Sequence, residues 1–157
     1  MLAPPLNTDT LVSMKLPAVL HVDDNDEDVF LFRHAWKQVA VPNPLYGIGS
    51  FAEAVDYFEG RGRFADRESH PLPCLVLVDL QLLGGDGLEL LRWIRADSRF
   101  NSVRVVLLTG SANKQDAERA SRLGADSFIV KPQRQSDLIE TVRLIRASWL
   151  TPAAAET

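Results

Sequence analysis

The chain has 157 residues, of which 46% are hydrophobic and 24% are charged, a composition typical of one soluble globular domain. Its formal net charge is −4, and no basic stretch is dense enough to indicate a nucleic-acid surface. A single cysteine, Cys74, excludes an internal disulfide bond, and residues 1–16 lack the apolar run of a signal peptide or membrane span. We therefore expect a cytoplasmic protein that binds neither nucleic acid nor membranes.

Apolar segments alternate with amphipathic ones along the chain. In chain order, the patterns predict strand 18–23, helix 26–40, strand 44–50, helix 51–60, strand 74–80, helix 86–97, strand 103–110, helix 114–124, strand 126–131 and helix 136–150. Segment 74–80, CLVLVDL, is apolar almost throughout, which is typical of a strand buried on both faces. Five strands, each followed by a helix, indicate an α/β fold with a parallel sheet covered on both sides.

Local signals mark several helix ends. Ser50 is predicted to cap one helix and Gly60 to end it, Gly124 to end the fourth helix, and Ser136 to cap the last. Apolar residues at helical spacing predict the buried faces of the first helix (Val29, Phe32, Trp36 and Val39) and of the last (Leu138, Val142, Ile145 and Trp149). Segment 60–73, GRGRFADRESHPLP, is predicted to be a solvated loop rather than a partner contact.

The strand order does not follow from periodicity. Among doubly wound sheets, the flavodoxin-like (βα)5 order 2-1-3-4-5 suits a chain with five strands. This order places the first and third strands side by side, and ligands bind beyond the carboxyl ends of the strands at that point.

Polar side chains follow the apolar run of four predicted strands. Asp23 and Asp24 end the first strand, Asp79 the third, Thr109 the fourth and Lys131 the fifth. In the expected topology they gather at one edge of the sheet, where three carboxylates are unfavourable unless a cation lies among them. Oxygen ligands with a phosphate co-ligand suit Mg²⁺, and Lys131 and Thr109 add an ammonium and a hydroxyl donor. The set predicts a phosphoryl-transfer site.

Each residue also has a structural interpretation. Asp24 or Asn25 is equally suited to cap the following helix. Asp79 fits a turn at a strand end, the Lys131–Pro132 pair fits a strand exit, and GGDG at 84–87 fits a flexible turn. The joint occurrence of acids, a hydroxyl and a lysine at the ends of four strands favours function.

The chain resembles the receiver domain of a two-component response regulator from Pro17 to Leu150. The motifs that carry this resemblance are VLHVDDN, LVLVDLQL, DGLELLRWIR, VVLLTGS and ADSFIVKP. The length, the long segment 60–73 and the motif DDNDEDVFLFRHAW are similar to small regulators that accompany phytochrome-type photoreceptor kinases.

The resemblance implies a metal site. Asp24 and Asp79 would bind Mg²⁺ directly, together with the backbone carbonyl of Gln81, and Asp23 would act through water. Asp79 would accept the phosphoryl group from a histidine kinase.

The resemblance also implies a switch. Lys131 would pair with Asp79 and then with a phosphoryl oxygen, Thr109 would hydrogen-bond the phosphoryl group, and the Lys131–Pro132 peptide bond would be cis. Phe128 falls where the family carries a rotameric aromatic residue. Without a hydroxyl, Phe128 would switch by packing alone.

One departure from the family pattern concerns the loop after Asp79. Leu83 stands where the family usually has proline, and Gly84 and Gly85 follow it, so we expect a looser loop.

The predicted protein is a stand-alone receiver, a signalling module rather than an enzyme, with tails at 1–16 and 151–157 around a domain at 17–150. Its expected partners are a histidine kinase, an unidentified downstream protein and a second copy of itself.

Three other classes are alternatives. A hydrolase of the haloacid dehalogenase type would need an aspartate where Gln81 stands. A flavodoxin-like cofactor binder would need a hydroxyl-rich loop where this chain has acids. A degenerate receiver would act by protein contact alone, without phosphorylation.

Overall fold

The computed structural model describes residues 16–111 and 113–150, so most of the predicted tails lie outside the described residues. Its elements are β1 (Val19–Val22), α2 (Asp26–Gln38), β2 (Leu45–Ile48), α3 (Phe51–Glu59), η1 (Gly62–Phe64), β3 (Leu75–Asp79), β4 (Gln81–Leu82), β5 (Gly85–Asp86), α4 (Gly87–Arg95), η2 (Ser98–Phe100), β6 (Arg104–Thr109), α5 (Lys114–Arg122), β7 (Ser127–Val130), α6 (Gln135–Ile145) and η3 (Arg146–Leu150). No helix in this part of the chain is both long enough and apolar enough to span a bilayer.

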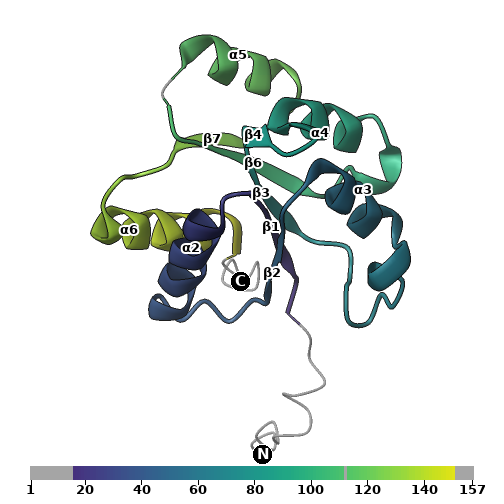
Figure 1. Cartoon of the computed structure of the whole chain (residues 1–157), viewed down its shortest axis with the longest axis horizontal. Helices are drawn as coiled ribbons and strands as arrows, with labels where there is room; N and C mark the ends of the chain where they lie inside the picture. The colour runs from purple at the N-terminus through teal and green to yellow at the C-terminus, as the bar shows by residue number, and fades with distance from the viewer. Residues whose placement is uncertain (1–15, 112, 151–157) are drawn as a thin grey trace, which may run out of the picture.

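The five main strands form one parallel sheet in the order β2-β1-β3-β6-β7, which confirms the predicted doubly wound topology. β1 and β3 are neighbours, with Val22 opposite Val78 near their carboxyl ends. Helices α2 and α6 cover one face of the sheet, while α3, α4 and α5 lie on the other (Figure 1). The carboxyl ends of β1, β3, β6 and β7 therefore meet at one edge.

The core divides into two clusters, one on each face of the sheet. Alternate residues of β3 enter opposite clusters: Val76 and Val78 join the cluster under α3 and α4, whereas Leu75 and Leu77 join the cluster under α2 and α6. All four are fully buried. The apolar run in segment 74–80 thus reflects burial on both faces, as predicted.

Helix ends follow local chemistry in most places. Asn25 caps α2 by accepting a hydrogen bond from the Asp28 N–H, Ser50 caps α3, and Gly60 ends α3 in the left-handed conformation at φ 68°. The prediction that Ser136 caps α6 is wrong. The Leu138 N–H already bonds to the Arg134 carbonyl, so the helix has begun before residue 136.

The prediction of a cis peptide bond between Lys131 and Pro132 is also wrong, because every peptide bond within the described residues is trans. A trans bond is the ordinary preference even before proline, by about 0.5–1 kcal/mol.

Segment 60–73 is mostly exposed to solvent, as predicted, but a few of its side chains anchor it to α3. Phe64 is buried, the Tyr57 hydroxyl donates to the Pro71 carbonyl over 2.9 Å, and Arg67 donates to the Tyr57 carbonyl over 2.6 Å. The His70 ring lies against the rings of Tyr57 and Phe64. Aromatic burial fixes a segment whose composition alone indicated solvent exposure.

The loop after β3, which was expected to be loose, contains regular backbone pairing. β4 and β5 pair as a short antiparallel hairpin. At its tip, the Leu83 carbonyl accepts a hydrogen bond from the Phe51 N–H over 3.2 Å, and Leu83 bridges to Ser50. Backbone pairing with the start of α3 therefore compensates for the missing proline.

Candidate functional site

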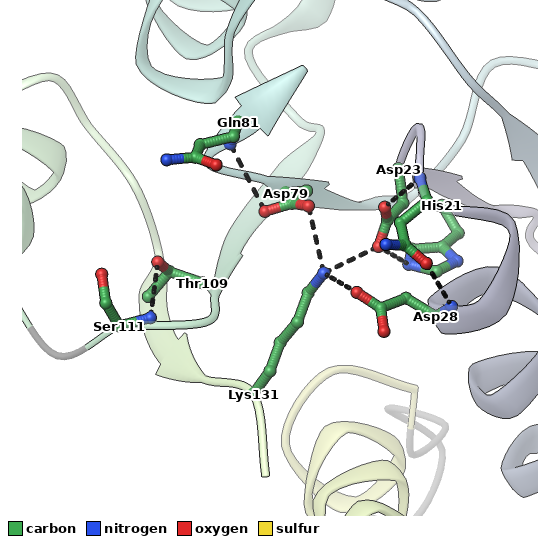
Figure 2. Close-up of polar contacts among 9 residues, drawn as sticks. His21, Asp23, Asp28, Asp79, Gln81, Thr109, Ser111 and Lys131 are labelled. Carbon is green, nitrogen blue, oxygen red and sulfur yellow. Dashed lines mark hydrogen bonds and ion pairs between the residues drawn. The ribbon is translucent and has the colours of Figure 1, made fainter. Parts of the chain in front are cut away.

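Four predicted residues come together at the carboxyl edge of the sheet. Asp79 ends β3 and Thr109 ends β6, while Asp23 follows β1 and Lys131 follows β7. Figure 2 shows Asp23 and Asp79 directed toward the ammonium group of Lys131. The parallel topology brings these residues together although 108 positions separate Asp23 from Lys131.

Lys131 is the centre of the arrangement. Its Nζ lies 2.8 Å from Asp23 Oδ2, 3.0 Å from Asp28 Oδ2 and 3.1 Å from Asp79 Oδ2. An ammonium group has three N–H donors, so these three carboxylates use all of its hydrogen-bonding capacity.

Burial and the neighbouring charges shift the pKa values of Asp79 and Lys131 in opposite directions. Burial raises the pKa of Asp79, and the nearby Lys131 ammonium only partly offsets that effect. Burial also works against the charged form of Lys131, but the hydrogen bonds that the ammonium donates to Asp23 and Asp28 outweigh this effect and raise the pKa of the lysine above its ordinary value. Lys131 is therefore a permanent positive charge beside Asp79 at physiological pH.

His21 is a buried neighbour of this cluster. Its Nε2 lies 3.8 Å from Asp23 Oδ2, and its ring lies against that of Phe32, with centroids 4.5 Å apart. Burial lowers the pKa of His21 to about 4, an effect that the attraction of Asp23 opposes without cancelling. His21 is therefore neutral at physiological pH and adds no positive charge to the site.

Asp79 and Thr109 each accept a backbone hydrogen bond at the site. The Gln81 N–H donates to Asp79 Oδ1 over 3.4 Å, a long bond, and the Ser111 N–H donates to Thr109 Oγ1 over 3.3 Å. Thr109 is almost fully buried, and a hydroxyl that accepts one hydrogen bond can also donate another.

Gly87 allows α4 to approach β3 closely. A Cβ atom at this position would lie 2.5 Å from the Asp79 carbonyl oxygen, a distance that side chains do not tolerate. The Gly87 N–H also donates to the Leu80 carbonyl over 2.7 Å. The interpretation of GGDG as only a flexible turn is therefore incomplete, since its last glycine permits this contact.

A polar cavity of about 380 Å³ opens beside Asp79. Its walls are Asp24, Asn25, Asp28, Asp79, Gln81, Leu82, Thr109, Gly110, Ser111 and Lys131. Asp24 is exposed there, while Asp23 is fully buried behind it. The two adjacent acids thus occupy different environments.

Asp28 is the residue that the sequence analysis missed. It lies in the first turn of α2, and its carboxylate joins those of Asp23 and Asp79 in a group whose oxygens lie within 4.8 Å of one another. Oxygen-only donors of this kind fit a hard divalent cation. The available signal was the density of acids in DDNDED, which did not identify the acid that turns inward.

Phe128, the predicted switch residue, lies in β7 opposite Leu107 of β6. It is partly buried and packs against the core cluster under α3 and α4.

Residues 19–143 match the response regulator receiver domain in a comparison with known protein families. A curated relative is the probable methanogenesis regulatory protein FilR2 of Methanothrix harundinacea. It is 33% identical over 135 residues, which cover 84% of this chain and 83% of the relative.

Solved structures of similar proteins include three regulators. RPA3017, of red light signalling in R. palustris, has a TM-score of 0.82 at 30% identity and covers 88% of this chain and 96% of its own. The phosphorylated cyanobacterial phytochrome response regulator RcpA has a TM-score of 0.79 at 29% identity, covering 87% and 95%. Mn²⁺-bound Rcp1, a response regulator known from Synechocystis, has a TM-score of 0.77 at 27% identity, covering 87% and 96%.

Proposed function

The chain belongs to the response regulator receiver family, and from that premise we propose that it is a phosphorylation switch whose acceptor is Asp79. Two-component signalling is the family's role, and the phosphoryl donor proposed here is the phosphohistidine of a histidine kinase. The observation that carries the proposal is the Asp79 carboxylate at the end of β3, 3.1 Å from a permanently charged ammonium. The phosphorylated relative RcpA supports it.

The proposed chemistry is an in-line transfer. An Asp79 carboxylate oxygen attacks the phosphorus atom, and the new O–P bond forms as the N–P bond of the donor histidine breaks. Lys131 neutralises negative charge that the phosphoryl oxygens bring to the site. The Thr109 hydroxyl donates a hydrogen bond to the transferred group and so holds it in one orientation.

The acidic side chains around the cavity are suited to a divalent cation, which we propose is Mg²⁺. Asp24, Asp79 and the Gln81 backbone carbonyl are the proposed ligands, with Asp23 acting through water. When bound, Mg²⁺ supplies positive charge to the phosphoryl oxygens. The existence of a Mn²⁺-bound form of Rcp1 supports the binding of a divalent cation. Asp24→Ala should weaken Mg²⁺ binding measured by calorimetry, and an unchanged affinity would exclude Asp24 as a ligand.

Acetyl phosphate and Mg²⁺ test the acceptor assignment directly. Intact-mass spectrometry should detect one added phosphoryl group on the wild-type chain and none on Asp79→Asn. Asp86→Asn is a matched control, because Asp86 caps α4 through its side chain and asparagine caps equally well. Equal phosphorylation of wild type and Asp79→Asn would refute the assignment, and no phosphorylation of either would favour a receiver that acts by contact alone.

The proposed compartment is the cytoplasm. The proposed kinase is of the phytochrome type. The support is the likeness to RcpA, a phytochrome response regulator, and to RPA3017 of red light signalling. Transfer from an autophosphorylated phytochrome kinase to the chain should exceed transfer from an unrelated histidine kinase at equal concentrations. Equal rates would reject this pairing and leave the acceptor assignment intact.

A homodimer through the α5–β7–α6 face is a further part of the proposal. Val130 and Leu144 expose apolar side chains there, at 44% and 59% exposure. Trp149 and Leu150 instead pack against the core of their own chain, which favours a structural role for these two residues. Light scattering on the full chain and on a chain that ends at Ala147 tests both roles, and a monomer in both cases would exclude the dimer.

A further inference from the structure

Asp28 reaches Lys131 from a different direction than the other two carboxylates. Asp23 and Asp79 extend from strand ends, whereas Asp28 extends from the first turn of α2. All three carboxylates contact the same ammonium, at 2.8, 3.0 and 3.1 Å. A phosphoryl oxygen on Asp79 can therefore gain a lysine N–H only if one of these bonds is given up.

Exposure identifies which carboxylate is displaced most easily. The Asp23 side chain has 0% exposed surface and Asp79 has 13%, but Asp28 has 42%. Asp23 is also held by the Asn25 N–H, which donates to its Oδ1 over 2.9 Å. When Asp28 leaves the lysine, water solvates its carboxylate, and the N-terminal end of α2 still favours negative charge there. Of the two carboxylates that keep their charge when Asp79 is phosphorylated, Asp28 is therefore the one that Lys131 loses at the lower cost.

Charge acts in the same direction. Three carboxylates and one ammonium give the group a formal charge of −2. This charge repels an incoming phosphoryl anion and attracts a divalent cation. Removal of the Asp28 charge should therefore favour the anion and disfavour the cation.

We infer that Asp28 restrains phosphorylation by competing with the phosphoryl group for Lys131. This inference rests on the proposed function, in which Asp79 is the acceptor. In the unphosphorylated protein, Asp28 holds the lysine toward α2. On phosphorylation, Lys131 keeps Asp23 and exchanges its bonds to Asp28 and to the esterified Asp79 for phosphoryl oxygens, so the first turn of α2 responds to the state of Asp79.

Beryllofluoride, which mimics the phosphoryl group, and Mg²⁺ alone are the two probes. Calorimetry should show that Asp28→Asn binds beryllofluoride about two- to fivefold more tightly at saturating Mg²⁺, the scale of a partly exposed ion pair. The same variant should bind Mg²⁺ alone more weakly, by a similar factor. A residue that only supported the fold would weaken both affinities.

Two variants control for charge and for the loss of the contact. Asp26 lies exposed in the same helical turn and forms no ion pair with any other residue between 16 and 150 that the structure describes, so Asp26→Asn should match wild type in both titrations. Asp28→Glu keeps the charge and should stay closer to wild type than Asp28→Asn does.

The outcomes separate the two proposals. If wild type binds beryllofluoride but Asp28→Asn binds it equally or more weakly, the restraint by Asp28 is refuted and the function stands. If Asp26→Asn also bound beryllofluoride more tightly than wild type, the restraint by Asp28 would be refuted as well. The loss of any nearby negative charge would then explain the effect. If wild type and Asp79→Asn bind beryllofluoride alike, the proposed function fails, and the inference fails with it.

Discussion

The Lys131 ammonium lies 2.8 Å from Oδ2 of Asp23, a carboxylate whose side chain has no exposed surface. The two residues follow β1 and β7, strands that β3 and β6 separate within the sheet. The lysine side chain therefore spans the carboxyl edge of the sheet and compensates a charge that water cannot reach. Stability and the proposed phosphoryl transfer depend on the same ion pair.

Lys131→Gln should lower the free energy of unfolding by about 1–3 kcal/mol at pH 7 without metal, because it leaves the buried Asp23 carboxylate without a cation. This loss of unfolding free energy is smaller than the loss for a fully buried ion pair, because Lys131 is partly exposed. Urea denaturation measures the loss, and Mg²⁺ should restore more stability to the variant than to wild type. Equal stabilisation by Mg²⁺ in both proteins would contradict this account.

Gly87→Ala should destabilise the fold by about 1–3 kcal/mol, the usual cost of an overpacked site, because its Cβ atom would collide with the Asp79 carbonyl. It should also slow phosphorylation by acetyl phosphate, since relief of the clash moves Asp79. Gly49→Ala is the control, because its Cβ atom would meet its nearest neighbour at 3.9 Å, an ordinary contact. Denaturation and intact-mass time courses compare the two variants, and similar behaviour would argue against the role of Gly87.

His21 should make the protein less stable in mild acid. Burial lowers its pKa from 6.5 to about 4 in the folded state, so below pH 6.5 the unfolded chain binds a proton that the folded chain excludes. Stability is therefore lost as the pH falls from 6.5 toward 4, by about 2 kcal/mol between pH 7 and pH 5.

The measurement compares how the free energy of unfolding changes from pH 7 to pH 5 in three proteins. His21→Leu should show a smaller loss than wild type, because leucine does not titrate. His34→Gln, which changes an exposed histidine of α2, should match wild type. An identical loss in wild type and His21→Leu would show that other groups cause the acid sensitivity.

Phe128→Ala should leave phosphorylation of Asp79 nearly intact while weakening any phosphate-dependent association. Phe128 packs partly against the core beside Leu107, and deeper burial on phosphorylation would contribute about 1–2 kcal/mol. Such an energy shifts a population about five- to thirtyfold. The measured quantity is the ratio of association constants with and without beryllofluoride. If Phe128→Ala had the same ratio of association constants as wild type, another element would transmit the signal.

Local sequence patterns were sufficient to predict the strands, the helices and which residues gather at the edge of the sheet. Apolar runs and helical spacing depend on local periodicity, and a parallel sheet brings all carboxyl ends to one edge. The predicted residues Asp23, Asp79, Thr109 and Lys131 therefore meet as expected, without any information on distant contacts.

The other side chains that join these residues depend on contacts between distant segments, which local patterns do not encode. Asp28 contacts Lys131 across 103 positions of the sequence, and among the acids of DDNDED nothing local distinguishes the one that turns inward. The burial of Phe64 in segment 60–73 and the pairing of Leu83 with the start of α3 were missed for the same reason. Local periodicity reports which face of an element is apolar, but contacts between distant segments depend on how close the packed backbones come, as at Gly87 and the Asp79 carbonyl.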